Sequence, residues 1–390
     1  MPEAPDSFAL SVVDDIAGIA PAEWDACAGT ANPFVRHAFL RALERSGSAV
    51  GERGWLPQHA ILRDSAGTLV AAAPMYLKSH SFGEYVFDWA WADAYERAGG
   101  RYYPKLQAAV PFTPVTGPRL LVRGDLDSRT AESARAALAE GLIRLAERHG
   151  VSSLHVTFPE DHEWRLLGES GYRQRTGIQF HLANPGYESF DDFLAALTSR
   201  KRKQIRRERR EVAESGLTLR RLTGADLESK HWDAFYAFYC RTADKRWGVP
   251  YLERAFFHEL GAAMPERVLL VMAEDARGRP VAGALNLIGD DALFGRNWGA
   301  AAEHDFLHFE ACYYQAIEFA IDHGLSRVEA GAQGEHKLQR GYLPAATYSA
   351  HWIADPGLDA PVGDFLARER RAVAEQIDLL MQHSPYRQAD

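Results

Sequence analysis

Apolar and polar positions in the second half of the chain follow the two periods of regular secondary structure. Residues 268–274 and 281–288 are mostly apolar and flank Gly278, a turn signal, so a β-hairpin is predicted. A further strand is expected at residues 292–298. Over residues 309–323 the apolar side chains recur at spacings of three and four, which predicts a helix with one buried face.

The first half has a similar order of patterns. Residues 59–63 and 69–77 predict a hairpin, and residues 85–91 predict a strand. A long helix is expected at residues 129–149, followed by a strand at residues 151–158. Because strand and helix patterns alternate in both halves, the fold class is α/β.

We interpret the two halves as a degenerate duplication with a period of roughly 200 residues, which is too long for a solenoid. The stretch that begins at Tyr85 is taken to correspond to the stretch that begins at Ala292. The segment Asn-Pro-Gly at residues 184–186 is rich in turn formers and is the predicted linker. The domains are therefore expected to cover residues 1–184 and 185–390.

Residues 327–342 hold the densest group of chemically able side chains. A short strand at residues 327–332 contains Gly331, which lets the backbone turn or approach a ligand. An acid, an imidazole and two cations follow within ten residues, and such a set just after a strand is a candidate reaction site. They are Glu335, His336, Lys337 and Arg340. The alternative interpretation is a turn and a solvated helix start.

The start of the helix at residues 309–323 adds two further candidates. His308 and Glu310 flank its first turn, where a carboxylate also suits the helix dipole, and both interpretations of Glu310 stay open. Cys312 lies on the apolar face, so we expect a buried structural thiol rather than a nucleophile. Tyr313 and Tyr314 are interpreted as core and rim residues.

Residues 200–210 form a strongly basic segment with eight basic residues and one acid. Thr198 and Ser199 are candidate helix N-caps, so we expect a helix with a positive stripe. The stripe would bind tRNA phosphates, a diphosphate or an anionic membrane face, with Arg202 and Arg206 among the binding residues. Alternatively, its cations pair with acids of the same protein, such as those at residues 191–192.

Composition excludes several classes of protein. The 390 residues are 46% hydrophobic, enough for one large or two medium domains. The net charge of −9 argues against a general polyanion binder. Three widely spaced cysteines argue against a zinc cluster or a disulfide scaffold, and no metal is expected. No signal peptide or membrane-spanning run is visible, so we expect a cytoplasmic protein, either free or peripheral at the inner membrane face.

Four strings carry a resemblance to a known family. They are PFVRHAFLRALE from Pro33, YYPKLQAAVPFTPVTGPRLL from Tyr102, LHFEACYYQAIEFAIDHG from Leu307 and GAQGEHKLQRGY from Gly331. With them the chain resembles the FemAB-like branch of the acyl-CoA N-acyltransferase (GNAT) superfamily, in particular bacterial proteins labelled peptidoglycan biosynthesis protein / GNAT family. The resemblance implies tandem GNAT-like domains with mixed central sheets flanked by helices.

In that fold the acyl donor lies where the fourth and fifth strands splay apart. Carried onto this chain, those strands are residues 292–298 and 327–332. The residues expected to line the opening are Trp298, Gly299, Gly331, Gln333 and Gly334. Lys337 falls near the lysine of a C-terminal phenylalanine–lysine motif of FemAB-like enzymes. Residues 296–301 fit the acetyl-CoA loop pattern formally, although the pattern begins inside the predicted strand.

The resemblance implies an N-acyltransferase that moves an acyl or aminoacyl group to an amino group of a peptide, an amino acid or a cell-wall precursor. The donor would be an acyl-CoA or an aminoacyl-tRNA, and the first domain would be structural or would bind the acceptor. The candidate bases are Glu310, His336, Glu335 and His308, because amine attack needs a proton acceptor. Lys337 and Arg340 would hold an anionic group of the acceptor. The alternatives are an acetyl-CoA-dependent acetyltransferase of a small amine and a non-catalytic protein that binds RNA or an anionic lipid.

Overall fold

The computed structural model of the protein describes residues 8–246, 248–331 and 334–387. The chain forms two compact units, each built from two stretches of sequence. Unit 1 contains Met1–Gly177 and Thr347–Ala374, and unit 2 contains Ile178–Ala346 and Glu375–Asp390. The expected division after residue 184 assigns Thr347–Ala374 to the second domain. The structure assigns this stretch to unit 1, because its strand residues pair with the strand at Ser153–Thr157.

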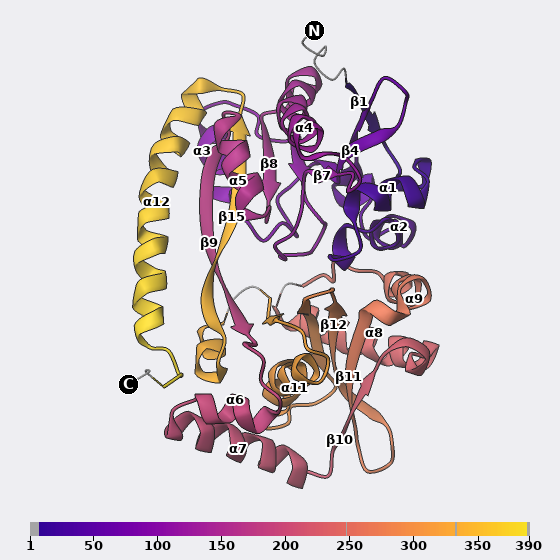
Figure 1. The fold of residues 1–390 in the computed structure, drawn as a ribbon, viewed down its shortest axis with the longest axis vertical. Helices are drawn as coiled ribbons and strands as arrows, with labels where there is room; N and C mark the ends of the chain where they lie inside the picture. Colours follow the sequence, from indigo (N-terminus) through magenta and orange to yellow (C-terminus); the bar gives the residue numbers. More distant parts are fainter. Residues whose placement is uncertain (1–7, 247, 332–333, 388–390) are drawn as a thin grey trace. The chain divides into compact units, whose positions relative to one another are not determined.

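Unit 2 is built on a mixed sheet that begins with an antiparallel meander (Figure 1). The meander strands are β10 (Thr218–Leu222), β11 (Val268–Glu274), β12 (Pro280–Ile288) and β13 (Ala292–Ala300). The next strand, β14 (Arg327–Glu329), runs parallel to β13 and pairs on its other edge with β9 (Arg173–Ala183). The predicted hairpin and the strand that follows it are confirmed, with β11 at the expected bounds.

The connection between β13 and β14 is the predicted amphipathic helix, and it contains a π turn. Helix α10 (Leu307–Phe309), the π turn η6 (Glu310–Tyr314) and helix α11 (Gln315–Asp322) follow one another without a break. A π turn inserts one extra residue into a helix and often marks a functional position. The other helical segments of unit 2 are α6 (Phe190–Ala196), α7 (Ser199–Glu214), η4 (Gly224–Asp226), α8 (Ser229–Arg246), α9 (Arg254–Ala263), η5 (Pro265–Arg267) and η7 (Glu335–Arg340).

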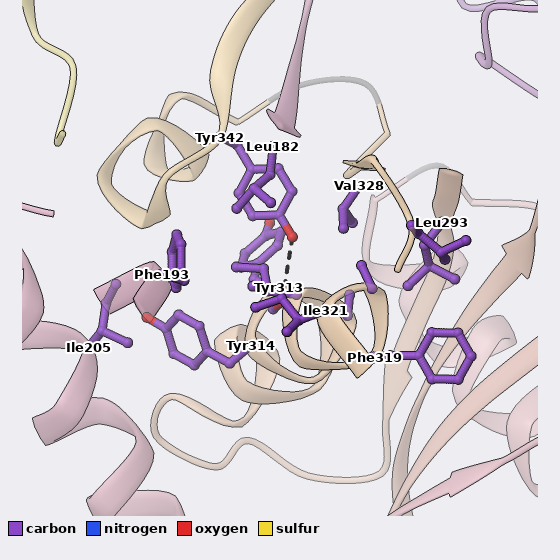
Figure 2. Close-up of a cluster of buried hydrophobic side chains, with 14 of the residues drawn as sticks. Leu182, Phe193, Ile205, Leu293, Tyr313, Tyr314, Phe319, Ile321, Val328 and Tyr342 are labelled. Carbon is purple, nitrogen blue, oxygen red and sulfur yellow. Dashed lines mark hydrogen bonds between the residues drawn. The ribbon is translucent and has the colours of Figure 1, made fainter. Parts of the chain in front are cut away.

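The core of unit 2 lies between this helix and the sheet (Figure 2). Tyr314 points toward Phe193 and Ile205, whereas Tyr313 lies beside Tyr342, with the two ring centroids 5.4 Å apart. The hydroxyl of Tyr342 donates to the backbone oxygen of Tyr313 at 3.5 Å. Both tyrosines of the π turn are therefore buried, although they are adjacent in sequence.

Unit 1 repeats the order of hairpin, strand, long helix and parallel strand. One sheet contains β1 (Ala9–Val13), β3 (His59–Arg63), β4 (Leu69–Ala73) and β7 (Leu121–Val122). Strands β2 (Trp55–Pro57), β5 (Met75–Lys78), β6 (Lys105–Ala108), β8 (Ser153–Thr157) and β15 (Leu343–Ile353) follow one another in the second. The helical segments are η1 (Ile16–Gly18), α1 (Pro21–Ala28), η2 (Pro33–Val35), α2 (His37–Arg45), η3 (Gly51–Arg53), α3 (Trp89–Arg97), α4 (Ser128–His149), α5 (Asp161–Glu169) and the part of α12 (Pro356–Gln382) up to Ala374.

The strand predicted at residues 85–91 is wrong. Trp91, Ala92 and Tyr95 gather on one side of helix α3, at helical rather than alternating spacing. The counterpart of β13 is instead β6, which runs parallel to β8 after the long helix α4. The predicted correspondence between the stretches from Tyr85 and from Ala292 is therefore wrong in register.

The mixed sheets and flanking helices confirm the predicted α/β class. Among the described helices, none combines the length and the apolar character needed to cross a bilayer.

Candidate active site

Strands β13 and β14 pair over a short distance only. Their parallel pairing joins Ala292–Phe294 to Arg327–Glu329, after which β14 ends and β13 continues to Ala300. A register shift between β12 and β13 at Asn286 marks a β-bulge beside this point. Gly331 has φ of 73°, a left-handed conformation that favours glycine. It still lies against β13, because a Cβ built on it would be 3.4 Å from the backbone oxygen of Gly295.

Lys337 lies buried at this turn. Its Nζ donates to the backbone oxygen of Gly331 at 2.7 Å, and its side chain is 3% exposed. Burial lowers the pKa of Lys337 to about 8, because the charged ammonium loses its hydration. A buried lysine with a lowered pKa, close to the end of the pairing between β13 and β14, is a candidate functional group.

A group of aromatic rings surrounds His336 and His308. The hydroxyl of Tyr313 and Nε2 of His336 are 2.9 Å apart, which is hydrogen-bond distance. The ring of His308 lies 5.4 Å from Tyr313, 5.4 Å from Trp298 and 6.1 Å from His336, centroid to centroid. The structure thus brings together two predicted bases and one predicted donor-lining residue. Tyr313 was predicted as core or rim, and its contact with His336 is a polar role that helical spacing does not reveal.

Glu310 does not have the free carboxylate expected of a base. It is 4% exposed, and its two oxygens accept hydrogen bonds from Arg209 at 3.1 and 3.2 Å. Gln315 donates a further bond of 2.7 Å to one of these oxygens. Arg209 also pairs with Glu318 at 3.1 Å. Glu310 therefore belongs to an ion-pair network that ties helix α7 to the π turn.

Arg340 is likewise buried in an ion pair, which corrects the expectation that it binds the acceptor. Its Nη2 donates to the carboxylate of Glu208 at 2.9 and 3.1 Å, and its guanidinium lies 3.3 Å above the ring of Phe309. Glu208, the single acid of the basic segment, also accepts from the hydroxyl of Tyr314. Breaking a buried pair leaves a charge uncompensated, so Arg340 positions η7 rather than a ligand.

Gln333 lies outside the described part of the chain, and so does the side chain of Glu335. Gly334 is described, has φ of 105° and begins η7. A Cβ at Gly334 would lie 2.6 Å from the ring of His336, so only glycine fits at this turn.

Gly299 packs against the protein itself. A Cβ at this position would lie 2.3 Å from the backbone of Phe238 in α8. Gly299 also pairs with Gly283 of β12 in the sheet. The close approach of α8 to β13 thus accounts for this glycine, and the formal acetyl-CoA loop pattern at residues 296–301 lies largely within β13.

Helix α7 covers the whole basic segment and begins after Thr198, whose side chain makes no cap hydrogen bond. Its inner face carries Ile205, Glu208 and Val212, all buried. Arg206 pairs with Asp191 at 2.8 Å, as the alternative interpretation expected. For the described residues, no carboxylate lies within 4 Å of five other cations, which are Arg200, Lys201, Arg202, Lys203 and Arg210.

Sequence comparison resolves the family. The profile described as peptidoglycan biosynthesis/recognition, FemAB-like, matches residues 15–388. The chain belongs to the FemAB-like family. The comparison with curated proteins gives no match.

Solved structures with the same fold include several of low sequence identity to this FemAB-like chain. FemX is 11% identical, with a TM-score of 0.55 over 88% of this chain and 98% of its own. L-PGS from Bacillus licheniformis is 11% identical, with a TM-score of 0.52 over 86% and 98%. The C-terminal domain of a putative lysylphosphatidylglycerol synthetase from Agrobacterium fabrum is 10% identical, with a TM-score of 0.53 over 89% and 95%. The resemblance inferred from the sequence strings is confirmed.

Proposed function

We propose that the protein is an N-acyltransferase that moves an acyl or aminoacyl group onto an amino group of a peptide or a cell-wall precursor. The observation that carries this proposal is the buried Lys337, which donates to the carbonyl of Gly331 just after the pairing of β14 with β13 ends. Membership of the FemAB-like family and the fold shared with FemX and L-PGS support it.

Lys337 would stabilise the negative charge that develops on the donor's carbonyl oxygen. A buried ammonium acts in a low-dielectric site, where one such donor contributes about 10²- to 10³-fold to the rate. The pKa of about 8 keeps most of the lysine charged at neutral pH. Its bond to Gly331 fixes the ammonium in position before the donor binds.

His336 would accept the proton of the attacking amine, with Tyr313 holding its ring. The amine nitrogen forms a bond to the acyl carbon, the bond from that carbon to the donor's sulfur or oxygen breaks, and the amine proton passes to His336. The hydroxyl of Tyr313 lies at hydrogen-bond distance from Nε2 of His336 and would hold the imidazole in place for this transfer. His308 and Trp298 would form an aromatic wall beside the reacting groups.

The donor is an acyl-CoA or an aminoacyl-tRNA. The five cations of α7 without a carboxylate neighbour favour a donor with many phosphates, because each neutralised phosphate releases counterions. Arg202 is one of these five, while Arg206 already pairs with Asp191.

A thermal-shift titration with acetyl-CoA, longer acyl-CoAs, free CoA and aminoacyl-tRNA would test the donor. A ligand that binds only the native state raises the melting temperature in a saturable way. We expect one donor class to do so and Trp298→Ala to weaken the effect. Transfer of the labelled acyl group to an amine, lost in Lys337→Met and kept in the exposed control Lys230→Met, would establish catalysis.

The alternative is a non-catalytic protein that holds RNA or an anionic lipid through α7. The same cations favour it. It predicts binding of tRNA or anionic vesicles that Lys337→Met leaves unchanged, with no transfer from any donor. That result would reject the acyltransferase proposal.

A further inference from the structure

Unit 1 contains a sheet face that is polar and yet buried. Strands β5, β6, β8 and β15 alternate apolar and polar residues, as strands with one wet face do. Their apolar side packs on α4. On the other side, Tyr76, Gln107, His155 and His351 stand in register across the four strands, and all are at most 1% exposed. Burying so many polar groups is costly and is typical of a site rather than of a core.

Two lysines extend this polar face. Lys78 of β5 and Lys105 of β6 are direct cross-strand partners, and both are fully buried. Like charges directly opposite each other destabilise a sheet unless something compensates them. His155 and His351 form a similar pair, with their Nδ1 atoms 2.6 Å apart. Burial lowers the pKa of His155 to about 3 and that of Lys78 to about 7, whereas Glu84 and Asp88 raise the pKa of Lys105 despite its burial. Lys105 therefore supplies most of the positive charge of this face near neutral pH.

The compensation comes from one segment, residues 79–88, which we call the acidic cap. Lys105 donates to Glu84 at 2.7 Å, to Asp88, and to Ser81 at 2.8 Å. Lys78 lies 3.8 Å from Glu84 and donates to the backbone oxygen of Phe82 at 3.3 Å. The cap thus places two carboxylates on two lysines.

The fit of the acidic cap is incomplete. Oε1 of Glu84 and Oδ1 of Asp88 are buried without a hydrogen-bond partner, although both side chains are at most 5% exposed. On the polar face, Oε1 of Gln107 is also buried without a hydrogen-bond partner. A buried acceptor without a partner has lost its hydrogen bonds to water and has gained none in the protein. It would regain the bonds to water if the cap opened. Burial also raises the pKa of Glu84 to about 7, which weakens its hold on the lysines near neutral pH.

The outer side of the acidic cap and the start of α3 are unusually apolar. Phe82, Phe87 and Trp89 are each about half exposed, and the ring of Trp89 contacts the rings of both phenylalanines. Tyr85 has φ of 60°, a conformation that costs a non-glycine residue energy. Exposed aromatic side chains and a strained backbone in one segment indicate that the acidic cap has a second conformation.

We propose that the polar face of unit 1 is a binding site for a compact dianion, and that the acidic cap occupies it in the unliganded protein. The carboxylates of Glu84 and Asp88 stand in for the charged groups of the ligand on Lys105 and Lys78. A dicarboxylate or a phosphate has this chemistry. The site lies within unit 1 and does not depend on the proposed acyl transfer.

Hydrogen exchange of the wild-type protein tests this proposal without a variant. Glutarate and inorganic phosphate are added in separate series at constant ionic strength, with chloride as the reference. We expect exchange in residues 79–88 to increase and to saturate with at least one dianion, while β6 and β8 stay protected. The dianion that acts identifies the source of the charge.

Lys78→Gln tests whether the polar face binds the dianion. Lys78 is chosen over Lys105 because its nearest carboxylate is farther away, so its replacement should destabilise the fold less. We expect the half-saturation concentration to rise about tenfold, the usual effect of losing one charge-assisted contact. Arg144→Gln, an exposed cation of α4, is the matched control and leaves it unchanged. Equal exchange in chloride and in both dianions, or a decrease in residues 79–88, would overturn the proposal.

Discussion

Lys337 in unit 2 and Lys105 in unit 1 are both buried, but they have opposite chemical tendencies. Burial lowers the pKa of Lys337 to about 8, and its Nζ donates to a carbonyl. Burial alone would also lower the pKa of Lys105, yet the carboxylates of Glu84 and Asp88 raise it. A carbonyl dipole offsets the loss of hydration less than full negative charges do. Burial therefore shifts Lys337 toward its uncharged form, whereas Lys105 is held as a cation.

Lys105→Met gives the largest effect expected from this comparison. Its removal leaves Glu84 and Asp88 buried without their cation, so we expect a loss of about 3–5 kcal/mol in the free energy of unfolding. Urea denaturation measures it. Combining Lys105→Met with Glu84→Gln and Asp88→Asn should recover much of the loss. A loss below about 1 kcal/mol would mean that the two lysines do not differ as described.

Lys337→Met should separate activity from stability. We expect transfer to fall about 10²- to 10³-fold, because a donor to the developing oxyanion is lost. The free energy of unfolding should stay unchanged or rise, since burial disfavours the charged form of Lys337 and the substitution removes that cost. Steady-state kinetics and urea denaturation of the same preparation measure both. A large loss of stability would make Lys337 a structural residue like Lys105.

The pH dependence of stability should sharpen the contrast. The pKa of Lys337 is lowered on folding, so the unfolded state binds more protons between pH 8 and about 10.5, and stability rises with pH there. Relative to Lys337→Met, the wild type should gain at most about 1.4 kcal/mol per pH unit in this window. Below pH 8 both states are charged and the difference is constant. A wild-type curve parallel to that of the variant would contradict the lowered pKa.

Tyr313→Phe should have the smallest effect. It removes the hydroxyl that contacts Nε2 of His336 and keeps the ring. We expect a fall in kcat of about tenfold, in the range of one hydrogen bond, with KM little changed. The acidic limb of the pH–rate profile should shift, which mere loss of packing would not cause. Phe319→Leu, a core change on the same helix, is the control, and an equal effect there would count against a role for Tyr313.

Local patterns predicted unit 2 well because its elements bury one regular face. β11 has the predicted bounds, and the helix before β14 was predicted from its apolar spacing. The π turn at Glu310–Tyr314 was not predictable, because its extra residue leaves the apolar spacing almost intact. In unit 1 the aromatic run around Trp91 suits both a strand and a helix, and only packing decided for the helix.

The location and the roles of the candidate site stay predictions. The structure shows that His336 and His308 lie close together and that Lys337 contacts Gly331. Glu310 and Arg340 were expected to act on substrates, but their partners, Arg209 and Glu208, come from a helix about one hundred residues earlier in the chain. No local pattern reports such a pairing.

The sequence by itself determined the α/β class, the family, and the stretch that carries the candidate chemistry, because these depend on local periodicity and on characteristic strings. Only the tertiary structure decided which charges are neutralised. Glu208 and Arg340 hold each other, Lys105 is surrounded by carboxylates, and Lys337 rests on a carbonyl. The reason is that the state of a charge depends on its burial and on neighbours that the fold brings from distant positions.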